Sequence, residues 1–299
     1  MDRLALLQTY VAVVESGSFT AAAARLGLSR AMASRHIQVL EDRLGVRLLH
    51  RTTRRVSPTE PGLGYLERAR RLLADFEDAE TEARGERAAP RGTLRVNAPV
   101  SFGRTRLAAA LPGFLARYPG LTVELTVNDR VVDLIEEGFD VAVRIGRLAD
   151  SSLVARRLGS VAIRLAASPA YLARHGTPAE PADLGGHAWL GYAYSSGIGT
   201  GTLRRLTHAD GREATVRVAG PLTANNGDVL VEAAAGGAGI VAQPDFILDP
   251  YLADGRLVTV LPDWGIPDLG IYAVHHQSRH VAAKVRAFVD HLAEWFRVP

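Results

Sequence analysis

The chain has 299 residues, 47% of them hydrophobic, and no cysteine, so it is long enough for about two domains and excludes disulfide bonds and thiol redox sensing. No apolar run approaches the ~18 residues of a membrane-spanning helix, so no membrane partner is expected and the chain is expected to be cytoplasmic. The net charge is +3, but residues 1–58 hold nine arginines against four acidic residues; this leaves +5 there and −2 in residues 59–299, which indicates a nucleic-acid-binding head on a near-neutral body.

The first predicted element is an amphipathic helix over about residues 2–16. Leu4, Leu7, Val11 and Val14 recur on one face, and this stripe is expected to cover the two helices that follow. The helix also carries charged residues, which distinguishes it from a signal peptide.

Residues 18–44 are predicted to form two short helices that meet at a tight turn. The first ends at Gly27, a residue that tolerates the positive φ of a helix C-terminus, and Ser29 is the expected N-cap of the second. An apolar stripe on the second helix is expected to face a core: Ala33, Ile37, Leu40 and Leu44. The opposite face is small or polar: Arg30, Ala31, Ser34, Arg35 and Gln38.

The polar face of this second helix suits the edges of DNA bases. Arg35 can donate two parallel hydrogen bonds to guanine, Gln38 can form a similar pair with adenine, and the small Ala31 allows close approach to a thymine methyl group. An ordinary amphipathic helix with a solvated face shows the same pattern, so the neighbouring residues have to decide between the two interpretations.

A small basic wing is predicted after Gly45. Its expected strands are residues 46–49 and 54–56, on either side of a polar tip over residues 50–53. Arginines in such a wing can reach phosphates or the narrow minor groove. The residues expected to make these contacts are Ser29, Arg51, Arg54 and Arg55.

The run SFTAAAARLGLSRAMASRHIQVLEDRLGVRLLHRTTRRVSPTEPG resembles the winged helix-turn-helix of LysR-type transcriptional regulators. The resemblance covers helix, turn, helix, wing and the entry to the next helix without a gap. Pro61 departs from it, since proline replaces the usual small residue in the first turn of the next helix, where proline is tolerated. The resulting hypothesis is a domain that binds double-stranded DNA and reads bases with Arg30, Ser34, Arg35 and Gln38.

A long helix is predicted from Thr59, its N-cap, to about residue 84. Its apolar residues follow a seven-residue repeat that two further leucines widen: Leu66, Ala69, Leu73, Phe76 and Ala83, with Leu63 and Leu72. The charged residues around this stripe make the helix too polar to be buried in one domain, which favours pairing with a second copy, and the resemblance implies the same dimerising linker. A helix packed on its own effector domain is the alternative. Residues 85–92, rich in charge and helix breakers, form the expected hinge.

From residue 93 strands alternate with helices, which predicts an α/β fold with a parallel, doubly wound sheet. The expected strands are 93–98, 121–127, 139–144, 161–167, 188–192, 203–208, 213–218, 240–242, 257–261 and 271–275. The expected helices are 102–118, 129–137, a short one after Pro169, 228–235 and 281–296. The late strand and helix indicate that the chain returns to the first lobe.

This order of elements resembles the two-lobed, periplasmic-binding-protein-like effector domain of the LysR family. The segments FDVAVRIGRLADSSLVARRLG, NNGDVLVEAAAGGAGIVAQP and KVRAFVDHLAEWF carry the resemblance, which is weakest around residues 192–211. The implied division is a winged helix-turn-helix (1–58), a linker helix (59–84), a hinge (85–92) and an effector-binding domain (93–299), with lobe I at about 93–160 and 268–299 and lobe II at about 161–267.

Ligands of open α/β sheets bind where helices begin beyond the carboxyl ends of strands. Ser101 and Asn226 open such helices, and plain helix capping is the alternative role for each. Arg144, at the end of a strand, is a candidate for binding an anion, with a salt bridge as the alternative. The resemblance implies a small-molecule effector in the cleft between the lobes, with anions as one candidate class. The other residues expected to line this cleft are Phe102, Asn128, Gly146, Ile240 and Pro244.

Motifs of catalysis and metal binding are not found. The chain lacks G-x-S-x-G, H-E-x-x-H and Walker sequences, so no enzyme and no cofactor are expected. Residues 197–202, GIGTGT, lack the last glycine of a dinucleotide fingerprint and are predicted to be a loop. His275 and His276 are expected on opposite faces of one strand, so together with His280 they do not predict a metal site.

The sequence therefore leads to the hypothesis of a LysR-type transcriptional regulator. It is expected to bind DNA as a homodimer or homotetramer, to respond to a small molecule and to have RNA polymerase as a further partner. The alternative is a solute-binding or sequestering protein whose basic head is a non-specific nucleic-acid tether.

Overall fold

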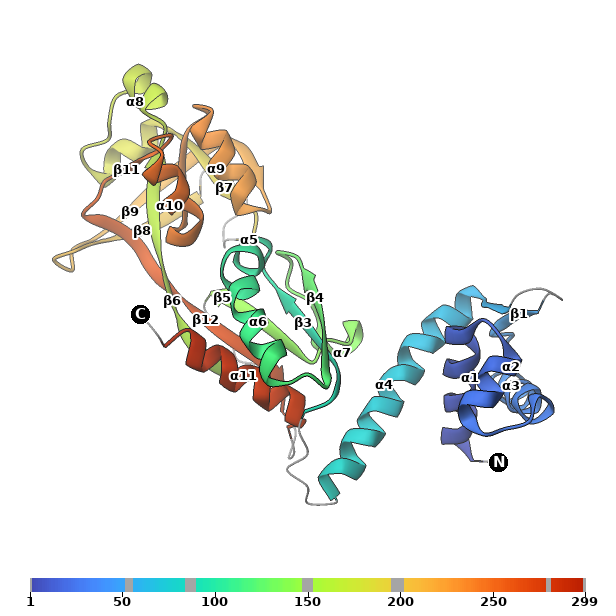
Figure 1. The fold of residues 1–299 in the computed structure, drawn as a ribbon. Coiled ribbons are helices and arrows are strands. Elements are labelled where there is room, and N and C mark those ends of the chain that lie inside the picture. The colour runs from blue at the N-terminus through green and yellow to red at the C-terminus, as the bar shows by residue number, and fades with distance from the viewer. Residues whose placement is uncertain are drawn as a thin grey trace. The chain divides into compact units, whose positions relative to one another are not determined.

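The computed structural model of the chain describes residues 2–51, 56–83, 90–146, 153–194, 202–277 and 281–297. The chain forms two compact units, residues 1–88 and 89–299, each with its own hydrophobic core (Figure 1). Within the described ranges, no helix is both long and apolar enough to cross a membrane.

The first unit begins with three short helices whose ends are set by local sequence. These are α1 (Arg3–Ser16), α2 (Phe19–Leu26) and α3 (Arg30–Leu44). Each is capped by a side chain that accepts a first-turn N–H, from Asp2, Ser18 and Ser29 respectively. Each ends at a glycine with positive φ, namely Gly17, Gly27 and Gly45. Capping and glycine termination therefore explain the turn between α2 and α3, as predicted.

The buried face of α1 is broader than predicted. Leu4 and Leu7 are only half-buried, whereas Leu6, Tyr10 and Val13 are fully buried. The predicted stripe is confirmed at Val11, which is buried, and at Leu7 and Val14, which pack against the core. The buried face is wider than this stripe because α1 contacts α2 and α3 on one side and the long helix α4 (Glu60–Ala83) on another.

The apolar stripe of α3 is confirmed except at its end. Ala33, Ile37 and Leu40 are buried, but Leu44 is 40% exposed. At the end of the helix the carboxylate of Glu41 is buried instead, because it accepts hydrogen bonds from the start of the wing, the N–H groups of Leu48 at 2.9 Å and Leu49 at 3.1 Å.

The wing is a two-stranded antiparallel ribbon of β1 (Leu49–Arg51) and β2 (Val56–Pro58). The strands lie two to three residues later than predicted, since residues 46–48 precede the ribbon and are tied to α3 through Glu41. Of the predicted tip, Thr52 and Thr53 lie outside the described residues, as do Arg54 and Arg55.

Helix α4 begins after Thr59, whose hydroxyl accepts the N–H of Gly62 at 3.0 Å, as its predicted role of N-cap requires. Leu66 and Ala69 are buried in the core of the first unit. The predicted apolar stripe is therefore only partly buried. Three of its members are exposed: Leu63, Leu72 and Phe76. The side chain of Ala83 and most of the predicted hinge lie outside the described residues.

The second unit opens with three parallel strands, in the order β5–β3–β4, and the helices that follow them. The elements are β3 (Gly92–Ala98), α5 (Val100–Phe102), the π-helical turn η1 (Gly103–Leu107), α6 (Ala108–Arg117), β4 (Leu121–Val127), α7 (Leu134–Glu137) and β5 (Val141–Gly146). The helix predicted over 129–137 is shorter, because Asp133 caps α7 and thereby fixes its start. We call this half, together with the C-terminal helix α11 (Ala283–Trp295), lobe I.

The other half, which we call lobe II, is a mixed sheet with its own helices. Its elements are α8 (Pro169–His175), the 3-10 helix η2 (Pro181–Gly186), β7 (Ala188–Tyr192), β8 (Thr202–His208), β9 (Glu213–Ala224), α9 (Gly227–Ala235), β10 (Ile240–Pro244), α10 (Asp245–Ala253) and β11 (Val258–Val260). The predicted parallel pairing is confirmed for β7 with β9 and with β10, whereas β8 pairs antiparallel with β9. Helix α10 was missed from the sequence; Pro244 precedes it and Pro250 lies inside it, where proline is normally unfavourable.

Two long antiparallel strands join the lobes, β6 (Leu153–Ala167) and β12 (Trp264–His276). The lobe II end of β6 pairs with β10 and β11, whereas the other end of β12 pairs with β5 of lobe I. Figure 1 shows both strands running from one lobe to the other. The prediction recognised only their ends, 161–167 and 271–275, because the middle of each strand lies between the lobes and lacks a continuous apolar pattern.

Candidate DNA-binding surface and effector cleft

The face of α3 that points away from the core is available for contact. Arg30, Ala31, Arg35 and Gln38 are exposed, and Ser34 is half-buried. In the part of the chain that the structure describes, no carboxylate pairs with Arg30 or Arg35. The two guanidinium groups are therefore available to base edges or phosphates.

Helix α3 is held rigidly beneath this face. His36 is buried and shares a 2.8 Å hydrogen bond between its Nδ1 and the hydroxyl of Thr9 on α1. Ser29, a predicted phosphate contact, accepts the N–H of Met32 at 3.1 Å and so caps the helix. A rigid helix with a capped start holds its outer side chains at fixed spacing, as base reading requires.

The described residues give a partial view of the wing. The backbone of Arg51 lies in β1, but its side chain is not described, and Arg54 and Arg55 lie outside the described residues. Arg47, at the base of the wing, pairs with the buried Glu41 at 2.9 Å.

Sequence reasoning missed two residues here. Met32 is 48% exposed on the first turn of α3, beside the predicted polar face. Glu41 is buried and joins the recognition helix to the wing. A clue to Glu41 was present, since an acidic residue at an otherwise apolar position of a strongly basic domain is unusual.

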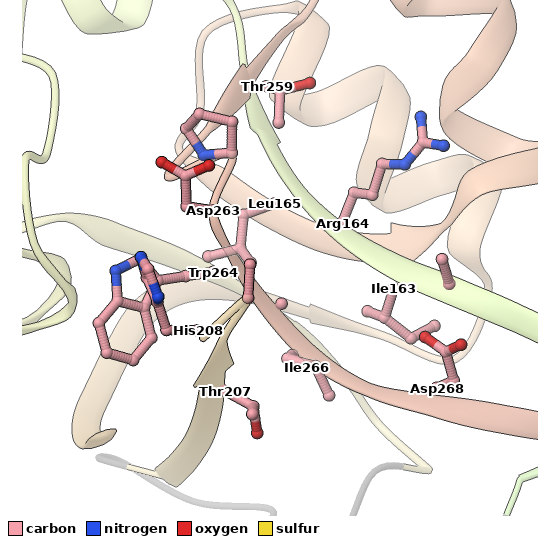
Figure 2. Close-up of a pocket in the computed structure, with 14 residues that line it drawn as sticks. Ile163, Arg164, Leu165, Thr207, His208, Thr259, Asp263, Trp264, Ile266 and Asp268 are labelled. Carbon is pink, nitrogen blue, oxygen red and sulfur yellow. The ribbon is translucent and has the colours of Figure 1, made fainter. Parts of the chain in front are cut away.

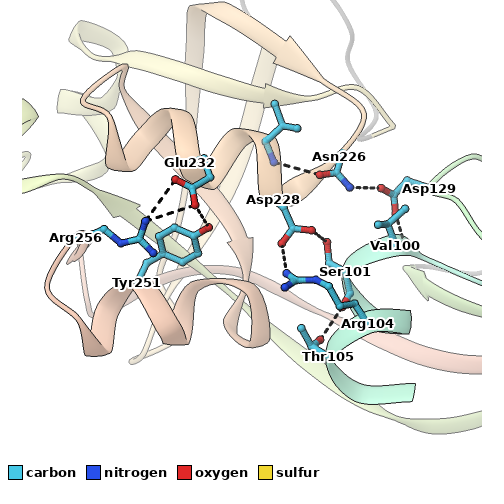
Figure 3. A network of polar contacts seen from close by, with 11 residues as sticks. Val100, Ser101, Arg104, Thr105, Asp129, Asn226, Asp228, Glu232, Tyr251 and Arg256 are labelled. Carbon is cyan, nitrogen blue, oxygen red and sulfur yellow. Dashed lines mark hydrogen bonds and ion pairs between the residues drawn. The ribbon is translucent and has the colours of Figure 1, made fainter. Parts of the chain in front are cut away.

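In the second unit, the two predicted helix-start residues lie on facing helices. The Asn226 side chain accepts the N–H of Val229 at 3.2 Å, so it caps α9, and its Nδ2 also donates to Asp129 Oδ2 at 2.9 Å. Ser101 is not a cap, because its buried hydroxyl donates to Asp228 Oδ2 at 2.7 Å. Both side chains thus contact a carboxylate of the opposite lobe (Figure 3).

Arg144 on β5 is half-buried and bonded to oxygen atoms of lobe I. It donates to the carbonyl of Val132 at 2.9 Å, with longer contacts of 3.4 Å to the carbonyl of Arg130 and to Oδ1 of Asn97. Burial lowers the pKa of this guanidinium. Across the described ranges Arg144 forms no salt bridge, which was the alternative to anion binding. Its hydrogen bonds hold the loop before α7 instead.

The remaining predicted cleft residues lie in several environments. Phe102 is fully buried. Its ring stacks on that of Phe296, with 5.5 Å between the ring centroids, and is edge-on to that of Phe246 of α10, with 5.8 Å between the centroids. Ile240 is fully buried in the core of lobe II. Three others lie at strand ends: Asn128 after β4, Gly146 at the end of β5 and Pro244 at the end of β10.

Asn128 has one unusual feature. Its side-chain oxygen is buried and forms no hydrogen bond to any described residue, while its backbone N–H donates to Ala98 at 3.0 Å. Buried acceptors of this kind are rare in folded proteins. Asn128 therefore has unused capacity to accept a donor.

The acidic residues between the lobes were missed from the sequence. Asp129 follows β4 and Asp228 lies in the first turn of α9, and each contacts the other lobe. Arg104 also donates to Asp228, at 2.8 Å. Burial, with Asp129 as the next cause, raises the pKa of Tyr192 at the end of β7. Sequence spacing carries no signal for these contacts, because the partners are about a hundred residues apart.

Among the described residues, no group of three or more His, Cys, Asp or Glu side chains could hold a metal ion. His280 and most of the GIGTGT run lie outside those residues. A hollow of about 260 Å³ lies in lobe II between β6, β8 and β12 (Figure 2). Its lining includes Arg164, His208, Asp263 and Trp264, but the Trp264 ring already contacts His208 at 5.0 Å.

Comparison with known proteins agrees with this architecture. The family model described as "Bacterial regulatory helix-turn-helix protein, lysR family" matches residues 4–63, and "LysR substrate binding domain" matches residues 87–297. The regulator CrgA of Neisseria meningitidis is 36% identical over 289 residues, which cover 96% of this chain and 95% of CrgA. A transcriptional repressor of Pseudomonas aeruginosa is 36% identical over 296 residues, 99% of this chain and 93% of the repressor.

Solved structures show the same likeness. The CrgA structure, described as a LysR-type transcriptional regulator, has a TM-score of 0.60 and 35% identity, and covers 99% of both chains. The full-length virulence activator AphB of Vibrio cholerae has a TM-score of 0.60 and 32% identity, and covers 98% of this chain and 99% of AphB.

Proposed function

The chain belongs to the LysR family of transcriptional regulators, in which a DNA-binding helix-turn-helix is joined to a substrate-binding domain, and we propose that it reads its operator with α3 and responds to a small molecule bound between lobes I and II. Its family also confirms that it is not an enzyme. A transcriptional regulator acts on DNA, and we expect it to do so in the cytoplasm.

The observation that carries the proposal for DNA is the exposed face of α3. Arg30, Ser34, Arg35 and Gln38 are assigned to bases, with Ala31 allowing close approach. Ser29, Arg51, Arg54 and Arg55 are assigned to phosphates or the minor groove. Arg30 and Arg35 support this assignment, because neither pairs with a carboxylate of any residue that the structure describes, whereas a solvated structural face commonly pairs such charges.

For the effector, the proposed site is the cleft lined by Ser101, Asn128 and Asn226, backed by Phe102, Arg144, Gly146, Ile240 and Pro244. Ser101 and Asn226 support it because they belong to facing helices of the two lobes. Asn128 adds an unused acceptor. An anionic effector remains a prediction, in which Ser101 and Arg104 would donate to the ligand.

Assembly and transcription partners are part of the same proposal. We expect a homodimer or homotetramer that places two helix-turn-helix domains on two spaced half-sites, with RNA polymerase as a further partner. Regulation then requires the effector to favour one arrangement of the assembly over another, since tight binding by itself shifts nothing.

A footprint of the full-length protein on the DNA upstream of its own gene, at near-physiological salt, tests the proposal. Two protected patches separated by whole helical turns are expected. A salt series on random DNA is the control, because a non-specific tether would bind random and upstream DNA alike and lose both steeply with salt. That result would favour a sequestering protein with a nucleic-acid tether and contradict the proposal.

A further inference from the structure

Among the described residues, polar side-chain contacts join the two lobes of the second unit where α5 faces α9, beside a hydrophobic core cluster that contains residues of both lobes. Lobe I provides Ser101, Arg104 and Asp129, and lobe II provides Asn226 and Asp228 (Figure 3). Three polar interactions of described residues run from one lobe to the other: Ser101 to Asp228 at 2.7 Å, Arg104 to Asp228 at 2.8 Å, and Asn226 to Asp129 at 2.9 Å. We call these five residues the clasp.

Each half of the clasp is anchored in its own lobe. Asp129 accepts the N–H of Val100 at 3.0 Å, so the carboxylate is held at the start of α5. Asn226 is fixed as the cap of α9, and Asp228 lies in the first turn of that helix. A movement of α9 relative to α5 therefore has to break the crossing bonds and cannot be absorbed by side-chain rotation alone.

The remaining connection between the lobes permits such a movement. In the described ranges the chain passes between the lobes in β6 and β12, and their pairing shifts register between Ile266 and Leu269 and again between Ile271 and Tyr272. Irregularities of this kind bend and twist a ribbon locally. Within the ten-stranded sheet that β6 and β12 make continuous between the lobes, two crossing strands with register shifts have the form of a hinge, on which domain closure depends in two-lobed proteins.

The burial of the clasp decides which of its bonds matters most. Arg104 is exposed, with 66% of its side chain accessible, so water and salt weaken its ion pair with Asp228. Ser101 is 4% exposed, and its hydroxyl donates to the Asp228 carboxylate at 2.7 Å, so water competes least for this bond. Behind it, the rings of Phe102 and Phe246 meet across the lobes at 5.8 Å.

We propose that the clasp, with the Ser101–Asp228 bond at its centre, holds lobes I and II closed when the effector is absent. Ser101 and Asn226 belong both to the clasp and to the proposed effector site, so a ligand bound there has to share or replace these bonds, and ligand binding is thereby coupled to lobe geometry. This inference rests on the proposed function only where it takes the cleft as the effector site.

The distance between the lobes can be measured directly, because the chain has no cysteine. We would introduce Ala109→Cys on α6 and Ala253→Cys on α10, both at exposed positions, and attach spin labels to the full-length chain. Dilution with unlabelled chain restricts the pulsed electron-spin measurement to distances within one chain. No effector is added.

The parent is expected to give a narrow distance distribution. Ser101→Ala, and separately the double variant Asp129→Ala and Asp228→Ala, should give a longer and broader one, because the crossing bonds are lost. Asp249→Ala is the matched control, since it removes an ion pair with Arg164 inside lobe II and should leave the distribution unchanged. Thermal melts of all variants report whether each is folded, and Ser101→Ala is the conservative change if the double variant is not.

Distributions of both clasp variants that equal the parent's would overturn the inference. The upstream footprint, carried out on the same proteins, separates this failure from failure of the proposed function. Protected patches with an unchanged lobe distance reject the clasp alone, whereas absence of patches with the parent protein rejects the proposed regulator.

Discussion

At the scale of single residues, the outer face of α3 is where sequence specificity is expected to originate. Arg35 is exposed in the middle of the helix, above the buried Ile37 and His36 that fix its backbone. A guanidinium in this position can donate two hydrogen bonds to a guanine, and this contact depends on the base. A contact to a phosphate would not depend on the base.

Replacing Arg35 by Ala should weaken binding to the operator by about 1–3 kcal/mol and relax the preference for one base. The measurement is a binding titration against the operator and against single-base variants of each half-site. Arg25→Ala is the matched control, because Arg25 is an exposed arginine of the same domain that pairs with Glu15 and lies outside α3. An unchanged half-site profile in Arg35→Ala would remove Arg35 from the base-reading set.

Tyr10 predicts how the first unit responds to alkaline pH. Its phenol is fully buried and donates to the carbonyl of Gly62 at 2.8 Å. Burial, followed by the nearby Tyr65 and Glu41, raises the pKa of Tyr10 to about 12. Unfolded tyrosine loses its proton near pH ~10, so the stabilisation by the neutral phenol is complete below that pH and is lost as the pH rises towards 12.

The expected consequence is a free energy of unfolding that falls between pH ~10 and 12, and less steeply in Tyr10→Phe. At neutral pH the same variant should lose about 1 kcal/mol, because the carbonyl of Gly62 loses its partner. Denaturant unfolding at a series of pH values provides both numbers. Tyr118→Phe, in the second unit, is the control that should leave the first unit's pH dependence intact, and an equal slope in Tyr10→Phe and the parent would contradict the assignment.

At the scale of elements, the start of α4 is packed tightly against the helix-turn-helix. A Cβ added at Gly62 would lie 2.1 Å from the carbonyl oxygen of Leu48 and 3.0 Å from the hydroxyl of Tyr10. The glycine is therefore needed for close approach of α4 to the base of the wing. Gly64, two residues later on the same helix, has nothing within 4 Å of an added Cβ.

Replacement by alanine is expected to change stability in opposite directions at these two glycines. Gly62→Ala should destabilise the first unit by about 1–3 kcal/mol through overpacking. Gly64→Ala should stabilise it by up to about 1 kcal/mol, since alanine favours helix more than glycine does. Chemical denaturation of both variants is the measurement. If Gly62→Ala proved as stable as Gly64→Ala, the tight docking of α4 would be incorrect.

At the scale of the whole molecule, α4 carries exposed apolar residues that the first unit does not cover. Leu72 and Phe76 are 56% and 44% exposed on a helix otherwise lined by charged residues. Pairing with a second copy would bury them and would place two copies of α3 on one DNA molecule.

The double variant Leu72→Glu and Phe76→Glu should shift the assembly towards monomer and weaken operator binding together, because like charges would meet at the pairing seam. Sedimentation velocity over a range of concentrations measures the first effect and an operator titration the second. Leu203→Glu, an equally exposed leucine on β8 of lobe II, is the control. An unchanged oligomeric state would favour α4 packed on its own effector domain instead.

Local chemistry made much of the architecture predictable from the sequence. Ser29 and Gly45 define the ends of α3 through a hydroxyl that caps and a glycine that accepts positive φ, and neither effect depends on distant residues. The strand of residues 121–127 was predicted at its observed limits for the same reason, since strand periodicity is a local property. The base-reading face followed from the helical period alone, and its assignment remains a prediction.

The contacts between the lobes could not be predicted from local chemistry. Ser101 was read as a cap or a ligand contact, yet its hydroxyl bonds to Asp228, 127 residues away in the sequence. Asp129 and Asp228 were not singled out because an acidic residue near a helix start is ordinary on its own. The lengths of β6 and β12 were underestimated for a related reason, because the middle of each strand is extended only through its pairing with the other strand.

The sequence by itself thus determined the family, the helix-turn-helix and the alternating α/β order, because helix caps, glycines and side-chain periodicity act over a few residues. Only the tertiary structure decided that two carboxylates join lobe to lobe, that Gly62 admits α4 to the wing, and that the α4 stripe is partly buried. Those features arise where segments that are distant in the chain come into contact. The free energy of such a contact depends on both segments together, so neither segment's sequence shows it alone.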